Sequence, residues 1–226
     1  MHRSALLIAL LLLGGCKSQP AAAAADASVA AAKPSALAAD AGGCVEPRMK
    51  AIAMTTPLTI DGELDEVDWR STDSSKAFTA LHTGAFASPH SELRAVWSPK
   101  ALVLGLYAAD EDLRDDDMFV VRVQGAKGAI TFRVTARGAL SRVGGELPSG
   151  ARAAVDADGT FGDDSDYDEE WLVELELPWA ALGFEKPPAE VKVNAWRSDT
   201  PKGAQPRTTA WACAGEDAFG TITLAR

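Results

Sequence analysis

The chain has 226 residues, with 22 Lys or Arg against 32 Asp or Glu, so its formal net charge at pH 7 is −10. This acidic balance excludes the basic surface that DNA- and RNA-binding proteins need, so we expect no nucleic-acid partner. It would also repel anionic lipid, so attachment to a membrane requires something other than surface charge.

The first 15 residues have the order of an export signal. A short polar start containing Arg3 leads into an apolar stretch from Ala5 to Leu13. Two glycines then separate this stretch from Cys16. The stretch is too short to cross about 30 Å of hydrocarbon as a helix, which takes roughly 20 residues. We therefore predict a signal peptide at residues 1–15 that is removed on export.

The sequence Leu13-Gly14-Gly15-Cys16 resembles the lipobox of bacterial lipoproteins. The resemblance implies cleavage before Cys16, a diacylglycerol on its sulfur and an acyl chain on the new amine. Several chains bury enough methylene groups for stable anchoring. Lys17 stands where an aspartate would favour the inner membrane, so we expect a lipid-anchored envelope protein, with the outer membrane favoured. The alternative is an ordinary signal peptide followed by a chance cysteine.

Alanine is by far the commonest residue in the segment 16–43, which has almost no bulky apolar side chains. Such a segment cannot bury enough surface to offset the entropy of ordering, and Pro20 and Pro34 interrupt any helix. We expect a disordered tether here and one domain at residues 44–226, which is long enough for its own core.

Two cysteines, Cys44 and Cys213, remain once Cys16 carries lipid. They stand at the start of the domain and shortly before its last predicted strand. Outside the cytoplasm two such cysteines are expected to pair, which would bring the ends of the domain together. The alternative is two free thiols.

Alternation of apolar and polar residues along the domain predicts strands. One face of the segment at residues 171–177 is wholly apolar: Trp171, Val173, Leu175 and Leu177. The segment Ala101–Ala108 is apolar on both faces, and the turn Ser98-Pro99-Lys100 joins it to Leu93–Trp97 as a hairpin.

Further strands are predicted at Met118–Val123, Phe132–Ala136, Val191–Arg197 and Gly220–Leu224, with short helices near Glu63–Trp69 and Pro178–Leu182. The expected fold class is therefore all-β: an antiparallel β-sandwich, jelly-roll or immunoglobulin-like, with one or two short helices.

Four landmarks in order resemble family 9 carbohydrate-binding modules, which belong to the DOMON-like sandwiches. They are Ile60–Glu66 with Trp69, the hairpin from Val96 to Asp110, Trp171–Glu174 with Leu177-Pro178-Trp179 and Leu182-Gly183, and Phe219-Gly220. The resemblance implies the sandwich fold, with these tryptophans in the core. It also implies a sugar held between two tryptophans, with polar side chains on its hydroxyl groups.

The sugar site implied by the family is largely missing from this sequence. The loops at residues 112–116 and 212–218, where the two sandwiching tryptophans would stand, contain no aromatic residue, and Val120 replaces a glutamate. Arg133 does match. As substitutes we predict a ligand face formed by Arg133, Trp196, Arg197 and Trp211. The alternative is that both tryptophans cap the edge of the core.

Acidic runs at residues 110–117 and 156–170 suggest calcium, which prefers six to eight oxygen ligands. The family resemblance implies structural calcium near the first run, so Asp110 and Asp117 are the predicted ligands; solvated loops are the alternative. In the second run Glu169 stands where an EF-hand needs glycine.

Nucleophile, zinc-protease and phosphate-loop motifs are absent from the sequence, and we predict no enzymatic activity and no further cofactor. The predicted function is binding of a glycan or another envelope ligand without catalysis. The alternative is a structural head that docks on a protein partner in the envelope.

Overall fold

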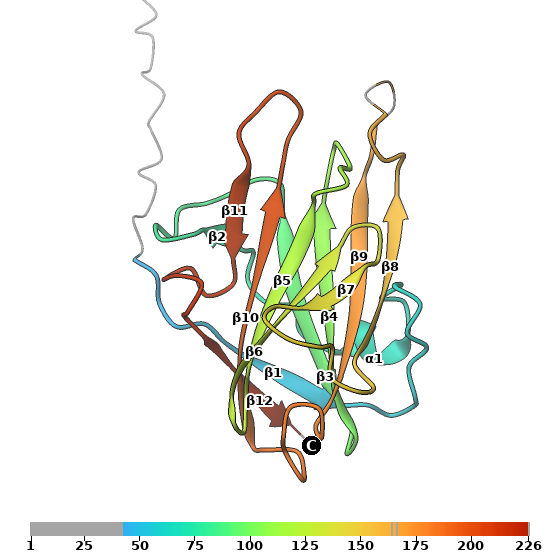
Figure 1. Cartoon of the computed structure of the whole chain (residues 1–226), viewed down its shortest axis with the longest axis vertical. Helices are drawn as coiled ribbons and strands as arrows, with labels where there is room; N and C mark the ends of the chain where they lie inside the picture. The colour runs from blue at the N-terminus through green and yellow to red at the C-terminus, as the bar shows by residue number, and fades with distance from the viewer. Residues whose placement is uncertain (1–42, 164, 166, 226) are drawn as a thin grey trace, which may run out of the picture. The chain divides into compact units, whose positions relative to one another are not determined.

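The computed structural model describes residues 43–163, 165 and 167–225, which form a β-sandwich with one short helix, α1 (Val67–Ser71) (Figure 1). The strands are β1 (Arg48–Ala53), β2 (Thr79–Ala80), β3 (Ser91–Trp97), β4 (Ala101–Ala109), β5 (Met118–Gly125), β6 (Gly128–Thr135), β7 (Leu140–Arg142), β8 (Arg152–Asp158), β9 (Glu170–Pro178), β10 (Glu190–Asp199), β11 (Arg207–Ala210) and β12 (Gly220–Ala225). The predicted signal peptide, Cys16 and the tether up to residue 42 lie outside the described residues. Within the described ranges, no helix is long and apolar enough to cross a membrane.

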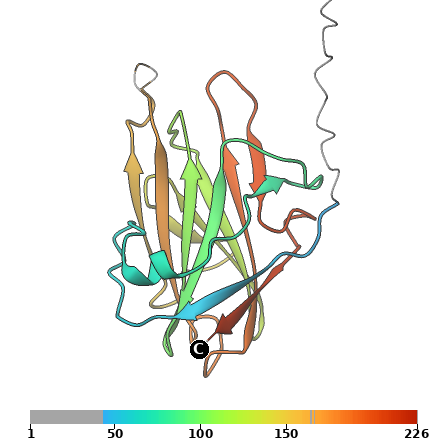
Figure 2. The ribbon, with the colours of Figure 1, turned by 180° about the vertical axis from the view of Figure 1, so that it is seen from behind.

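The strands form one mixed sheet that folds back on itself. Its order is β7-β6-β5-β10-β12-β1-β3-β4-β9-β8, with β11 also paired to β10 and β2 paired to β11. The β7-β6-β5-β10 part forms one layer and the β3-β4-β9-β8 part the other, while β1 and β12 cross obliquely near one end (Figures 1 and 2). This confirms the predicted sandwich. One departure is that β1 runs parallel to both of its neighbours, β12 and β3.

The pairing of β1 with β12 brings the two ends of the domain together. The sulfurs of Cys44 and Cys213 are bonded; the Cα atoms are 5.4 Å apart and the two residues are 169 positions apart in sequence. The predicted disulfide is therefore confirmed. A covalent loop of this length stabilises the fold by about 5 kcal/mol in the chain-entropy model.

The main core fills the space between the layers, and β4 contributes to it from one face only. Leu102, Leu104 and Leu106 point into this core, whereas Val103 packs with Trp69 in a second cluster on the outer face of β4. The prediction of a strand buried on both faces is therefore confirmed. Helix α1 and residues 54–66 cover that outer face.

The buried carboxylate of Glu174 fixes this covering segment to the sheet. It accepts hydrogen bonds from the backbone nitrogens of Asp61 (2.9 Å) and Gly62 (3.1 Å) and from Nε1 of Trp69 (2.9 Å). Gly62 has a φ of +101°, and a Cβ atom there would lie 2.4 Å from the backbone nitrogen of Asp156. The first sequence landmark, Ile60–Glu66 with Trp69, is thus held to the sheet by Glu174, which belongs to the third.

The same contacts correct one predicted helix. The segment near Glu63–Trp69 was expected to be helical, but α1 starts only at Val67, because the backbone of Glu66 is extended (φ −68°, ψ 159°) and the segment before it follows the two backbone contacts to Glu174. The segment Pro178–Leu182 is likewise a hydrogen-bonded turn rather than a helix: Leu182 N donates to the carbonyl oxygens of Pro178 and Trp179. A single helical turn does not extend into a helix unless further apolar side chains pack it against the core.

We predict that Glu174→Ala lowers the free energy of unfolding by about 3–5 kcal/mol, because three donors, two of them buried, lose their acceptor. Urea unfolding followed by tryptophan fluorescence measures it. Glu176→Ala is the control: Glu176 lies on the same strand and pairs with Arg152 at the surface, so about 0–1 kcal/mol is expected. Equal losses in both variants would contradict the role given to Glu174.

Candidate functional site

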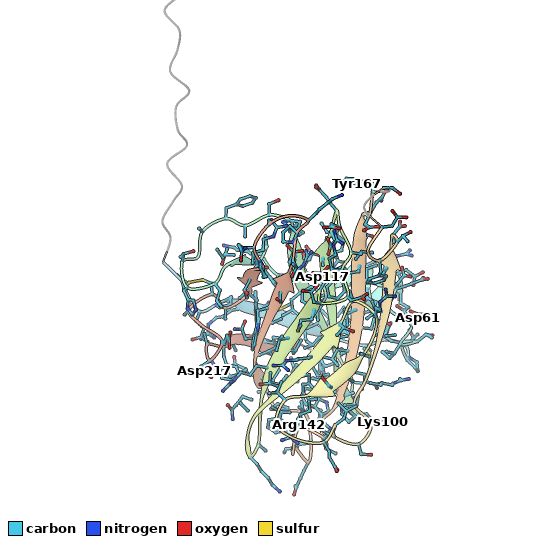
Figure 3. The ribbon with its side chains drawn as sticks, turned by 45° about the horizontal axis from the view of Figure 1, so that its top comes forward. Asp61, Lys100, Asp117, Arg142, Tyr167 and Asp217 are labelled. Atoms are coloured by element: carbon cyan, nitrogen blue, oxygen red, sulfur yellow. A yellow bond between two sulfur atoms is a disulfide. The ribbon has the colours of Figure 1, made fainter. Side chains whose placement is uncertain are left out.

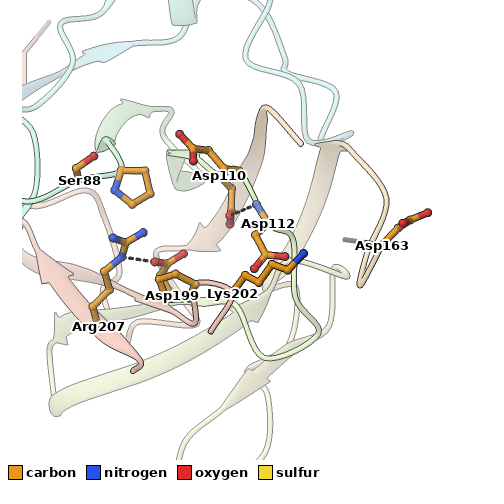
Figure 4. A pocket seen from close by; sticks show the side chains of 10 residues that line it. Ser88, Asp110, Asp112, Asp163, Asp199, Lys202 and Arg207 are labelled. Atoms are coloured by element: carbon orange, nitrogen blue, oxygen red, sulfur yellow. Dashed lines mark hydrogen bonds and ion pairs between the residues drawn. The ribbon is translucent and has the colours of Figure 1, made fainter. Parts of the chain in front are cut away.

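Three buried aspartates meet at one end of the sandwich. Asp110 directly follows β4, Asp117 directly precedes β5 and Asp199 ends β10. Each offers one carboxylate oxygen, and these oxygens all lie within 4.8 Å of one another. Figure 3 shows Asp117 within the fold, while Figure 4 shows Asp110 and Asp199 at the wall of a pocket. The three residues form what we call the aspartate cluster.

Backbone and indole donors hold two of these carboxylates in place. Asp117 accepts from the backbone nitrogens of Arg114 (2.8 Å) and Thr200 (3.0 Å). Asp110 accepts from Nε1 of Trp171 (3.2 Å) and from the backbone nitrogen of Asp112 (3.1 Å). The cluster is thus set by the β4–β5 loop, the β10–β11 loop and the core itself.

One buried guanidinium neutralises part of the cluster. Arg197, only 1% exposed, donates from Nη2 to Asp110 (2.7 Å) and to Asp199 (2.7 Å). Arg207 also pairs with Asp199 from the pocket side. The two hydrogen bonds given above for Asp117 both come from the backbone. Burial raises the pKa of Asp117 to about 7, and burial also raises the pKa of Asp110.

The cluster's donor set fits a hard divalent cation. Three carboxylates supply oxygen ligands of the kind that Ca²⁺ prefers, and the excess of negative over positive charge is what such an ion would neutralise. Asp110, Asp117 and Asp199 would hold it. The structure thus brings the two predicted ligands, Asp110 and Asp117, together and adds Asp199, which the sequence reading missed because it lies 82 positions beyond Asp117.

A polar pocket of about 390 Å³ opens beside the cluster (Figure 4). We call it the loop-end pocket; its lining residues are Ser88, Pro89, Asp110, Glu111, Asp112, Asp163, Asp199, Pro201, Lys202 and Arg207. Five carboxylates and two bases line it, so it offers both acceptors and donors of hydrogen bonds. Its walls come from loops β2–β3, β4–β5, β8–β9 and β10–β11.

A second carboxylate bridge gives this pocket an ordered wall. Asp168, 2% exposed, accepts from the backbone nitrogens of Leu113 (2.7 Å) and Thr160 (2.7 Å). It therefore joins the β4–β5 loop to the β8–β9 loop. Gly159 passes so close that a Cβ there would lie 2.1 Å from Oδ1 of Asp168. Part of the second acidic run is thus structural.

The four predicted ligand residues fall into three environments. Arg133 is exposed on β6, and Trp196 lies in the same row of the sheet, since both are paired with Val120. Trp196 is only 8% exposed and packs with Val120 and Ala210. Trp211 is 6% exposed and belongs to the main core, with its ring against Gly220.

Arg197 points away from that row, into the aspartate cluster. The structure therefore brings Arg133 and Trp196 onto one face but separates them from Arg197 and Trp211. Both tryptophans are covered, so they form no open pair of aromatic platforms, and their packing matches the alternative reading, in which they cap the core. Ligand binding by these four residues stays a prediction. Trp69, Trp171 and Trp179 are buried in the core as expected, and Trp97, also expected there, is partly buried against it.

Comparisons with known proteins concern the fold. No protein-family model matches the chain, and no curated protein matches its sequence. Among solved structures, a family 9 carbohydrate-binding module from Caldicellulosiruptor kristjanssonii in complex with cellotriose is similar, with a TM-score of 0.57 and 14% identity over 78% of this chain and 93% of that chain. The same kind of module with glucose gives a TM-score of 0.56 and 14% identity over 79% of this chain and 95% of that chain.

A Bacteroides uniformis protein proposed to bind carbohydrate is also similar, with a TM-score of 0.56 and 12% identity over 80% of this chain and all of that chain (100%). The chain therefore has a fold like that of family 9 carbohydrate-binding modules, as its sequence landmarks implied.

The aspartate cluster predicts a pH dependence of stability in the presence of EDTA. The native state keeps a proton on Asp117 up to about pH 7, whereas the unfolded chain releases it near 3.8, so stability should fall as pH rises between these values and level off above them. Thermal melts from pH 5 to 8 measure this slope.

Asp117→Asn should flatten the slope, although it loses one backbone hydrogen bond and melts lower overall. Asp217→Asn, at an 89% exposed side chain, is the control and should retain the slope. If Asp117→Asn leaves the slope unchanged, the titration of Asp117 is not its cause.

Proposed function

We propose that this protein is a lipid-anchored, non-catalytic glycan-binding protein of the bacterial envelope, and that the loop-end pocket holds the sugar. The observation that carries the proposal is a polar pocket of about 390 Å³ in a fold similar to sugar-bound modules. Sugar hydroxyl groups both donate and accept hydrogen bonds, so they match a lining that mixes carboxylates with Lys202 and Arg207.

Two exposed aromatic side chains supply what the shortened family loops lack. Phe86, 87% exposed, stands two positions before the lining residue Ser88. Tyr167, 69% exposed, lies near Glu111, another lining residue, whose negative charge raises the pKa of the Tyr167 hydroxyl; Figure 3 shows Tyr167 at the margin of the fold. An aromatic ring packs against the C–H face of a sugar, so both are candidates for the rim of the site.

Calcium in the aspartate cluster would serve the pocket indirectly. Asp110 and Asp199 belong to both the cluster and the pocket wall, so an ion that fixes them also fixes the loops that carry them. We therefore assign the ion a structural role, while the side chains that line the loop-end pocket would bind the sugar.

The lipid anchor rests on the lipobox-like Leu13-Gly14-Gly15-Cys16 alone. Export also agrees with the Cys44–Cys213 disulfide, since structural disulfides persist in oxidising compartments. Palmitate labelling in cells tests the anchor, because incorporation should depend on Cys16. An outer-membrane position is favoured by Lys17 in the following position.

We predict saturable binding of oligosaccharides to the domain from Gly43 onward, which contains every strand of the sheet and the whole core. Calorimetric titration with a panel that begins with cellotriose measures it. Phe86→Ala and Tyr167→Ala should each weaken binding by roughly 2- to 12-fold, the value of one aromatic contact. Leu147→Ala, which truncates another exposed apolar side chain, is the control and should bind normally. The absence of any heat of binding at millimolar sugar would end the proposal.

Calcium at 100 times its dissociation constant should stabilise the domain by about 2.7 kcal/mol. For a domain of this size, that corresponds to a rise in melting temperature of roughly 5–10 °C. Asp117→Asn and Asp199→Asn should abolish most of the rise, while the exposed Asp217→Asn should keep it. An equal rise in all three variants would place the ion outside the cluster.

A further inference from the structure

We infer that a cationic cleft at the other end of the sandwich binds an anionic oxygen group, a carboxylate or a phosphate. The cleft has a volume of about 320 Å³. Its lining residues are Lys127, Gly128, Ala129, Ile130, Arg142, Ala180, Ala181, Leu182 and Gly183. We call it the basic cleft. It lies at the far end of β5 from the aspartate cluster, since Asp117 precedes that strand and Lys127 follows it.

The basic cleft lies at the edge of the sandwich, where the two layers part. Arg142 on β7 is paired with Phe132 on β6, whose side chain is in the main core, so Arg142 faces inward. The opposite wall is the turn that follows β9, joined to the β5–β6 turn by a hydrogen bond from Ala126 N to Leu182 O (2.9 Å). Both walls are therefore fixed by backbone structure.

The charge of this cleft is opposite to that of the whole chain. Two bases, Lys127 and Arg142, and no carboxylate stand among its lining residues, in a protein with a net charge of −10. The loop-end pocket, by contrast, contains five carboxylates. A local reversal of sign attracts an anion to this place and not to the rest of the surface.

Arg142 carries a donor that the rest of the described structure does not satisfy. Its Nε is buried and has no hydrogen-bond partner among the described residues. The guanidinium is packed against Gly145, where a Cβ atom would lie 3.4 Å from Cζ. A buried donor without a partner is costly, and the planar fork of arginine matches the two oxygens of a carboxylate or phosphate. An anion in the cleft would pair with the guanidinium that carries this donor.

The floor of the cleft selects among anions. Ile130 and Leu182 are apolar, and Ile130 packs against the main core. A small hydrated ion would leave this floor uncovered, whereas an acidic sugar such as a uronate presents a C–H face beside its carboxylate. A phosphate group on an envelope polymer offers the same charge at the same position, so the test separates the two sources.

Arg142 has one other explanation. Strand β7 is at the edge of the sheet. An inward-facing charge on an edge strand, such as Arg142, discourages pairing with a strand of another molecule. That role requires no ligand and predicts no saturable response to anions. It also gives no reason for Lys127 to stand across the same cleft.

The test is a titration of the domain from Gly43 onward, followed by amide and arginine Nε–Hε resonances in ¹⁵N NMR at about 150 mM salt, where long-range effects of charge are screened. The probes are trigalacturonate, inorganic phosphate and, as the neutral control, cellotriose. We expect saturable shifts at residues 127–130 and at Arg142 Nε–Hε with trigalacturonate, phosphate or both. A response to one alone identifies the source.

Arg142→Gln should weaken this binding at least about tenfold, and Arg142→Lys should weaken it less, because lysine retains the charge and loses the fork. Arg70→Gln is matched in residue type and charge change at an exposed position of α1 and should bind as the unmodified domain does. Lys127→Gln tests the cleft without changing the edge strand. Shifts that do not saturate, or that survive both Arg142→Gln and Lys127→Gln, would overturn the inference.

Discussion

A buried guanidinium joins the two layers of the sandwich at the end that carries the loop-end pocket. Arg197 extends from β10 and donates to Ala109 O (2.6 Å) and Asp110 at the end of β4, in the opposite layer. It also holds Asp199 at the end of its own strand. A buried charge is tolerated only when it is paired, so these residues position one another and, with them, the pocket wall.

The same pairing leaves the aspartate cluster with more negative charge than Arg197 can balance. Asp117 lies in a place that water does not reach, and this burial raises its pKa to about 7 although two backbone nitrogens donate to its carboxylate. Protonation and a bound divalent cation are the two ways to relieve such a group. Protonation removes one negative charge from the cluster as pH falls, and a bound divalent cation would link the loops that carry the three aspartates.

The two ends of the sandwich differ in chemistry as well as in position. Acidic loops surround the loop-end pocket, and two bases without a lining carboxylate face the basic cleft. In Figure 3, Tyr167 and Arg142 mark these opposite ends. A polymer with both hydroxyl and acidic groups is a ligand that such a surface would suit, and a membrane tether of the predicted kind would keep the domain near polymers of the envelope.

The strands with regular alternation, the two-sided burial of β4, the fold class and the disulfide could all be predicted from the sequence, because they depend on local periodicity or on the pairing of two cysteines. Three other features required the folded structure: the parallel pairing of β1, the burial of Trp196 and Trp211, and the position of Asp199 beside Asp110 and Asp117. Those features depend on which distant strands become neighbours and in what register, and neither is set by residues close together along the chain.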